Sequence, residues 1–240
     1  MKKYIPALAV IFAAILWSFD GFLRQNLYNL PSLLIVALEH LIGAIIFFPL
    51  LLRGWKEISA LHQRGWVSVL WISLCGGVLG TFFYTKALSY VEYIDLSVVV
   101  LLQKFQPIFA IALAAIILKE KITLRFLKLA FLAMIGGYLV TFGNKPLSEW
   151  DDKTIIAALL SLLAAFSWGS STVLGKHALK ELSFKTLTSL RLMLTAIITF
   201  FILITTNEFE SINQINFTHW KYIILIVLST GSLALFVYYY

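Results

Sequence analysis

Charged residues are scarce in this sequence. Asp, Glu, Lys and Arg make up 13% of its 240 residues, whereas an ordinary soluble domain carries about 25%. Hydrophobic residues reach 60%, and the mean hydropathy is +0.90. They fall in long blocks and not in the narrow stripes of amphipathic helices. The composition therefore excludes an ordinary soluble domain and favours an integral membrane protein.

The sequence also lacks the motifs on which several classes of site depend. Its single cysteine, Cys75, excludes an internal disulfide. The metalloprotease motif H-E-x-x-H, the nucleophile motif G-x-S-x-G and the phosphate-binding P-loop are all missing. The four histidines are not spaced as metal ligands are. We therefore expect neither an enzyme nor a protein with a cofactor or a metal site.

Eight hydrophobic blocks are long enough to cross a membrane, for which a helix needs roughly 20 apolar residues. They are residues 4–23, 31–52, 66–84, 96–118, 126–142, 155–174, 187–204 and 220–240. Backbone groups in lipid must be paired within their own segment, so these blocks are expected to be helices. The sequence predicts an all-α integral membrane protein with eight transmembrane helices and almost no soluble part.

The net charge of +7 is distributed unevenly between the two sides of the predicted spans. With the N-terminus in the cytoplasm, twelve basic residues lie on that side: Lys2, Lys3, Arg53, Lys56, Arg64, Lys119, Lys121, Arg125, Lys128, Lys176, Lys180 and Lys185. Five lie on the far side: Arg24, Lys86, Lys145, Lys153 and Lys221. Cytoplasmic loops carry the excess of Lys and Arg. We therefore predict a multi-pass protein of the cytoplasmic (inner) membrane with a cytoplasmic N-terminus, and no nucleic-acid partner.

A faint internal repeat relates the two parts of the chain. Offsets of 151 and 154 residues pair similar positions: Trp17 with Trp168, His40 with Arg191, and Tyr84 with Tyr238. The repeat covers five spans, an odd number, so the second copy must enter the membrane from the opposite side. Such inverted repeats are typical of secondary transporters, which hold substrate near the midplane. We expect a first five-helix repeat at 1–146 and a partial second repeat of three helices at 147–240.

Several motifs occur in the order and spacing of a known transporter family. They are Trp17 with Asp20, Trp168-Gly169, the segment 87–91 (ALSYV), the segment 102–109 (LQKFQPIF) with its exit 118–123 (LKEKIT), Gly136-Gly137 and Arg191. In these positions the whole chain resembles the EamA-type transporters of the drug/metabolite transporter superfamily. The resemblance implies a ten-helix fold of two inverted five-helix repeats, of which this chain lacks the last two helices. An alternative expectation is therefore a truncated or partner-dependent chain, completed by association into an oligomer.

Ionisable residues inside spans require an explanation, because each costs roughly 2.5 to 3.5 kcal/mol on insertion scales. The predicted spans contain Asp20, Glu39, His40, Lys104 and Arg191, with Gln103 and Gln106 beside Lys104. At 1.5 Å per residue, Glu39 and Lys104 each lie about 12 Å from the far side. One interpretation is a binding or proton-relay site in the outer half of the bundle. The other is a structural Lys104–Glu39 pair that only fastens helices together.

The remaining candidates also carry two interpretations each. Pro107 has no N–H for the carbonyl of Gln103, which predicts a kink and a polar notch, or merely a bend. Trp17 and Trp168 are expected to face a central cavity, with core packing as the alternative. His40 either passes a proton or is simply hydrogen-bonded. Arg191 either belongs to the pathway or extends to the membrane interface.

Together these features predict a secondary active transporter that works by alternating access in a lipid bilayer. We expect an exporter of small metabolites or amphiphilic compounds, with Lys104 holding an anionic group. Proton coupling would use Glu39 and Asp20, the simplest groups to change charge. Two alternatives remain: a membrane module that needs a partner for transport, and a membrane-embedded lipid enzyme.

Overall fold

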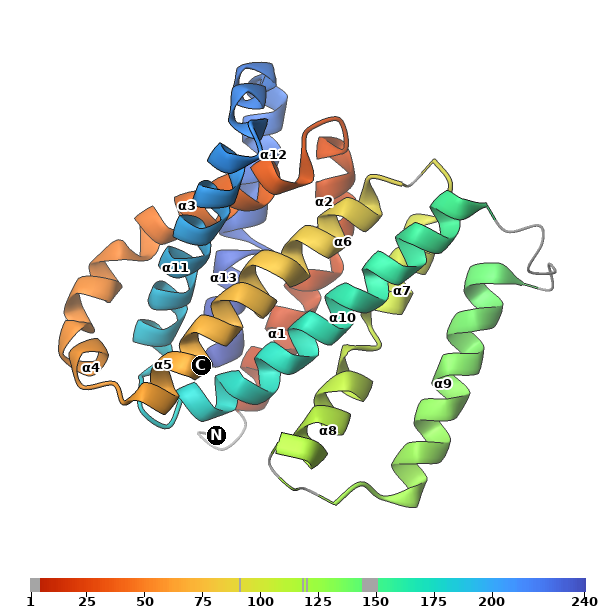
Figure 1. Ribbon diagram of the computed structural model, residues 1–240, viewed down its shortest axis with the longest axis horizontal. Coiled ribbons are helices and arrows are strands. Elements are labelled where there is room, and N and C mark those ends of the chain that lie inside the picture. The colour runs from red at the N-terminus through yellow and green to blue at the C-terminus, as the bar shows by residue number, and fades with distance from the viewer. Residues whose placement is uncertain (1–4, 91, 118, 120, 144–150) are drawn as a thin grey trace.

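The computed structural model of the chain describes residues 5–90, 92–117, 119, 121–143 and 151–240. Within these residues the chain is all-helical and contains no β-strand, as the sequence predicts (Figure 1). The basic residues Lys2, Lys3 and Lys145 lie outside the described part, as do Val91 of the segment 87–91 and residues 118 and 120 of the segment 118–123.

Thirteen α-helices make up most of the described chain. The helices before residue 143 are α1 (Ile5–Ser18), α2 (Asp20–Arg24), α3 (Ser32–Arg53), α4 (Trp55–Ser59), α5 (Gln63–Trp71), α6 (Gly80–Leu88), α7 (Leu96–Gln103), α8 (Gln106–Ile117) and α9 (Leu124–Phe142). Those after it are α10 (Asp152–Ala178), α11 (Phe184–Thr205), α12 (Phe217–Leu228) and α13 (Ser232–Tyr239). A π-helical segment, Ile72–Leu79, joins α5 to α6, and two 3₁₀ turns lie at Gln25–Leu27 and Glu208–Gln214.

Seven helical segments in the described ranges are long and apolar enough to cross a membrane. They are Ile5–Leu27, Ser32–Arg53, Gln63–Leu88, Leu96–Ile117, Asp152–Ala178, Phe184–Thr205 and Phe217–Tyr239. Each overlaps one of the predicted spans. The fifth predicted span, 126–142, forms the helix α9, which is not among the seven. The count of eight spans therefore remains a prediction.

Several helices of the first part of the chain pack against helices of the second part. Helix α3 lies along α11, and α10 lies along α6 and α8 (Figure 1). Helix α1 packs on α13. Near one end of the bundle, Leu34, Leu203 and Ile223 belong to one buried cluster. Towards the other end, Ile72 and Leu187 belong to a second. The apolar core is therefore shared between the two parts.

Helices α1 and α9 expose most of their apolar side chains, and α8 contains no buried residue. Only 17% of the span window in Ile5–Leu27 and 11% of that in Leu96–Ile117 is buried, against 56% in Phe184–Thr205. In α9, Ala130 and Gly137 are the buried positions among those described. Hydrocarbon tails are as apolar as leucine, so such faces are stable in lipid. We expect these helices to form part of the lipid-facing surface.

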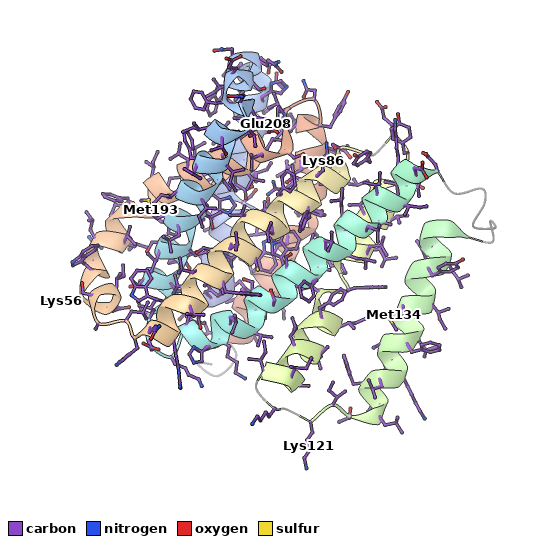
Figure 2. All side chains as sticks on the ribbon, viewed as in Figure 1. Lys56, Lys86, Lys121, Met134, Met193 and Glu208 are labelled. Carbon is purple, nitrogen blue, oxygen red and sulfur yellow. The ribbon has the colours of Figure 1, made fainter. Side chains whose placement is uncertain are left out.

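Charged residues mark the two ends of the helices. In Figure 2, Lys56 and Lys121 lie towards the lower end of the bundle, and Lys86 and Glu208 towards the upper end. This separation agrees with the sequence analysis, which placed Lys56 and Lys121 on one side and Lys86 on the other. Which end faces the cytoplasm remains a prediction from the excess of basic residues.

A close approach between the π-helical segment Ile72–Leu79 and α11 depends on glycine. A Cβ atom added at Gly77 would clash with the side chain of Thr195. The hydroxyl of Thr195 donates a hydrogen bond to the carbonyl oxygen of Ser73 at 3.1 Å across the same interface. Small residues allow this backbone approach in membrane helices.

We predict that Gly77→Ala destabilises the protein, because overpacking a close contact costs about 1–3 kcal/mol. The thermal unfolding midpoint of purified protein in detergent measures this effect. Gly136→Ala is the matched control, since a Cβ atom there meets nothing within 4 Å. That variant should keep or raise the midpoint, because alanine is the better helix former. Equal midpoints for the two variants would contradict the packing described.

Candidate functional site

One cavity between the helices collects most of the polar residues singled out in the sequence. It has about 900 Å³ of empty volume, part of which is continuous with the outside. Nine of the ten predicted site residues line it: Trp17, Asp20, Glu39, His40, Gln103, Lys104, Gln106, Trp168 and Arg191. The tenth, Pro107, is exposed and is not part of the lining. Residues from five predicted spans therefore meet in one place.

Three spans depart from α-helical geometry where they border the cavity. The first breaks at Phe19, between α1 and α2. The third contains the π-helical segment Ile72–Leu79, whose Gly76 lines the cavity. The last breaks between α12 and α13, where Thr230 and Gly231 line it. Irregular backbone at membrane depth is tolerated only where it is buried in protein or lines a cavity.

The fourth span is also interrupted, as its proline predicts. Helix α7 ends at Gln103 and α8 begins at Gln106, so Lys104 lies in the break. Because Pro107 has no N–H, it cannot donate to the carbonyl of Gln103. Pro107 thus shapes the wall of the cavity through the backbone although its own ring lies outside.

A buried ion triad of Asp20, Arg24 and Glu39 lies beside the cavity. Arg24 Nε donates to Asp20 Oδ2 and Nη2 donates to Glu39 Oε2, each at 2.7 Å. Arg24 Nη1 donates to the hydroxyl of Thr85 at 3.1 Å, and the hydroxyl of Thr230 donates to Asp20. The three charged side chains are 4–8% exposed. The triad, with a net charge of −1, ties together α2, α3, α6 and the break after α12.

The structural pair of Lys104 with Glu39, one of the two interpretations of these residues, is wrong, because Glu39 pairs with Arg24. The prediction that Arg24 lies on the far side of the membrane, beyond the hydrophobic block that ends at residue 23, is also wrong, because Arg24 is buried beside the cavity. A signal for the correct pairing was present in the sequence. Arg24 lies four residues after Asp20, a spacing at which opposite charges on a helix attract each other.

Two glutamines form a polar wall next to the break in the fourth span. Gln103 Nε2 donates to Gln106 Oε1 at 3.4 Å, and Gln106 Nε2 donates to the hydroxyl of Thr172 at 3.2 Å. Lys104 lines the cavity beside them with an exposed side chain. It forms no ion pair with the residues that the structure describes. Lys104 is thus a positive charge at the edge of the cavity.

Arg191 and His40 are held inside the bundle. Arg191 is 7% exposed and its Nη1 donates to the hydroxyl oxygen of Tyr239 at 2.6 Å, so it does not extend to the interface. His40 is 5% exposed, and its Nδ1 lies 2.9 Å from the carbonyl oxygen of Val36. A carbonyl oxygen only accepts, so this contact assigns the hydrogen to Nδ1.

Two aromatic pairs flank the cavity. The rings of Trp17 and Tyr238 have their centroids 5.2 Å apart at an angle of 54°, and those of Tyr84 and Trp168 are 5.4 Å apart at 57°. All four side chains line the cavity. The indole of Trp168 also donates to the carbonyl oxygen of Gly76 at 2.9 Å. The walls of the cavity therefore combine aromatic faces with a few polar groups, as small-molecule sites do.

Sequence comparisons relate the chain to membrane transporters. A family described as "EamA-like transporter family" matches residues 4–142 and 155–240. The "Riboflavin transporter ImpX" of Fusobacterium nucleatum subsp. nucleatum is 41% identical over 237 residues, which cover 98% of this chain and 79% of that protein. The "Uncharacterized transporter YoaV" of Bacillus subtilis is 26% identical over 93% of this chain and 75% of its own length.

Two further similarities are more distant. A "Riboflavin transporter" of Brucella anthropi is 25% identical over 150 residues, covering 62% of this chain and 48% of that protein. One solved crystal structure superposes with a TM-score of 0.60 at 16% sequence identity, covering 97% of this chain and 77% of the other. This last similarity concerns the fold alone.

We predict that Arg24→Gln strongly destabilises the protein. Removing one partner of a buried charge network leaves an uncompensated charge, which costs about 3–5 kcal/mol. Here two carboxylates would remain without their shared cation. The unfolding midpoint in detergent, followed by tryptophan fluorescence, measures the effect.

Two further variants control for this result. Arg125→Gln changes an exposed arginine on α9 and should leave the midpoint unchanged. The triple variant Asp20→Asn, Arg24→Gln, Glu39→Gln removes all three charges and should recover most of the lost stability. If the single variant unfolds at the wild-type temperature, the triad does not hold the four segments together.

Proposed function

The chain belongs to the EamA-like transporter family, and we propose that it carries riboflavin across the membrane through the cavity. Family and relatives make it a multi-pass membrane transporter. The substrate is inferred from two relatives, in Fusobacterium nucleatum and Brucella anthropi, that are named riboflavin transporters. Export, the direction expected from the sequence, is kept as part of the proposal.

The observation that carries the proposal is the pair of aromatic walls around one polar cavity. Riboflavin has a flat three-ring head and a chain of hydroxyl groups. Trp17 with Tyr238 and Trp168 with Tyr84 offer faces against which the ring system can stack. Gln103 and Gln106 offer amide groups to the hydroxyl chain.

The contacts around the cavity support alternating access by an inverted repeat. The repeat offsets pair Trp17 with Trp168 and Tyr84 with Tyr238, so each tryptophan packs on the tyrosine of the other repeat. A transporter of this type exposes one site to each side in turn by rocking one repeat against the other. Two equivalent aromatic pairs, one from each combination of the repeats, would keep similar contacts with the substrate in the two states.

Proton coupling in this proposal uses the two carboxylates expected from the sequence, but with a different cation. Asp20 and Glu39 share Arg24, and not Lys104, as their cation. Protonation of one carboxylate would weaken its bond to Arg24 and loosen the segments that the triad ties together. In this proposal the triad is the coupling element, and Lys104 is a charge at the entrance.

We predict that purified protein in proteoliposomes catalyses riboflavin counterflow. Trp17→Ala and Trp168→Ala should each weaken the apparent affinity for riboflavin about tenfold, because each removes a stacking face. Trp220→Ala, which lies outside the lining, is the matched control. Assays in vesicles of both orientations determine the direction of transport.

Three outcomes would count against the proposal. Counterflow of an unrelated metabolite without riboflavin would overturn the substrate. Folded protein that transports only when another chain is present would favour the partner-dependent alternative. Turnover of a lipid in the vesicles would favour the enzyme alternative.

We also predict that the cavity is reachable from both sides of the membrane in turn. In a background where Cys75 is replaced by alanine, Thr172→Cys places a thiol at a half-buried position of the cavity lining. A membrane-impermeant thiol reagent should label it from either side, since both states of an alternating carrier are populated. Ser161→Cys, which is buried outside the lining, should resist labelling from both sides. Labelling from one side only would contradict alternating access.

A further inference from the structure

At the lower end of the bundle, two carboxylates each cap a helix of the other part of the chain. Glu181, in the turn between α10 and α11, accepts a hydrogen bond from the backbone N–H of His62 at 3.1 Å, and its Oε2 lies 3.2 Å from His62 Nδ1. His62 is the N-cap of α5. In return, Glu57 on α4 accepts from the backbone N–H of Ser183, the N-cap of α11, at 2.7 Å. We name these contacts the lower clasp.

A second contact joins the two parts at the opposite end of α3. The side-chain amide of Asn29, in the turn before α3, lies 3.2 Å from Nε2 of His219. His219 belongs to the first turn of α12, where it forms a capping box with Asn216. This contact between Asn29 and His219 is named the upper clasp. Figure 1 shows the turn before α3 and the start of α12 near the upper end of the bundle.

The internal repeat makes the two clasps equivalent. The offset of 154 residues pairs His62, the N-cap of α5, with Asn216, the N-cap of α12. The offset of 151 pairs Ser32, at the start of α3, with Ser183, just before α11. Each clasp therefore joins the turn after the first span of one repeat to the start of the third span of the other.

Each clasp lies beside apolar packing to which both parts of the chain contribute. Leu61 and Leu182, the neighbours of His62 and Glu181 in the sequence, belong to one buried cluster. Leu30, the neighbour of Asn29, belongs to the other buried cluster, against which Ile215 also packs. Breaking a clasp would allow the packed side chains beside it to separate.

The helices that the clasps hold also border the cavity. The third predicted span lines it with Gly76 and Tyr84, and the eighth lines it with Thr230 and Leu235. The start of the third span is fixed by the lower clasp, and the start of the eighth by the upper clasp. A movement that opens one end between these helices must therefore break the clasp at that end.

The two clasps differ in strength. The lower clasp has two carboxylates, each of which accepts a backbone N–H bond, whereas the upper clasp is one contact without a carboxylate. Hydrogen bonds to a charged acceptor are roughly twice as strong as those between neutral groups. A carboxylate at a helix N-terminus is also favoured by the helix dipole.

We propose that the two clasps are the gates at the two ends of the transport pathway, and that their unequal strength sets the resting orientation of the carrier. Without substrate, the lower clasp stays formed and the cavity opens mainly towards the upper end. The inference rests on the proposed alternating access and adds the contacts that hold each of its two states.

The test compares the labelling rates of a cavity thiol from the two sides. Thr172→Cys in the Cys75→Ala background is labelled with a membrane-impermeant thiol reagent in vesicles of both orientations, without substrate. We expect faster labelling from the upper side. Adding Glu57→Ala with Glu181→Ala should raise the ratio of the lower-side to the upper-side rate about 3- to 10-fold. Asn29→Ala should instead lower this ratio about 3-fold.

Two exposed residues that belong to neither clasp supply the controls. Glu210→Ala removes a carboxylate and Asn213→Ala removes an amide, both from the 3₁₀ turn before α12. Each should leave the ratio of the two rates unchanged. The unfolding midpoint of every variant is measured in detergent, because a purely structural contact would change the midpoint and not the ratio.

The outcomes separate this inference from the proposed function. If the clasp variants leave the ratio as in the parent protein, or shift it in the same direction, the clasps are not gates, while riboflavin counterflow by the wild type would leave the proposed function intact. Faster labelling of the parent protein from the lower side would overturn the resting orientation. If folded wild-type protein shows no counterflow and every variant is labelled from one side only, both proposals fail.

Discussion

The hydrocarbon layer offers no hydrogen-bond partner, and this constraint organises the molecule. Each polar group inside a span must be satisfied by the protein or must line a space that admits water or a ligand. The ionisable residues Asp20, Glu39 and Arg191 accordingly turn inwards and meet in one cavity. Outside it, α1, α8 and α9 present apolar faces that lipid can cover.

The same constraint explains where the helices break. A broken helix exposes backbone N–H and carbonyl groups, which is tolerated only beside other polar groups. The breaks at Phe19, at Lys104 and at Thr230 all lie next to the cavity. One of these breaks contacts the triad directly, because the hydroxyl of Thr230 donates a hydrogen bond to Asp20. Irregular backbone and buried charge thus stabilise each other.

Much of this arrangement could be predicted from the sequence, because the cost of polar groups in lipid is a property of single residues. A charged residue in an apolar block must face the protein interior, which identified Asp20, Glu39 and Arg191 without a structure. Pro107 likewise predicted the interruption of the fourth span, since the missing N–H is a local fact. Seven of the predicted spans follow from block length alone.

Pairing between residues could not be predicted in the same way. The cation that pairs with Glu39 depends on the directions of side chains on several helices. Lys104 was the expected partner, but the structure shows Arg24. Arg24 was missed because it follows the last apolar residue of its block. Its ion pair with Asp20 holds it inside the bundle. The break after Leu228 was missed as well, because the sequence has no proline there that would predict it.

The charges around the cavity are distributed unevenly between the two parts of the chain. The offset of 151 residues pairs Asp20 with Ser171 and Arg24 with Gly175, so the second part has no equivalent of the ion triad. Near Gly175 the contact is with Tyr239, whose hydroxyl accepts a hydrogen bond from Arg191. The triad therefore lines the cavity from the first part of the chain, whereas the second part contributes Arg191, a charged donor bonded to Tyr239. In the proposed alternating access, an exchange of partners at Asp20 and Glu39 would therefore act through the first part of the chain alone, because the second part holds no matching set of charges.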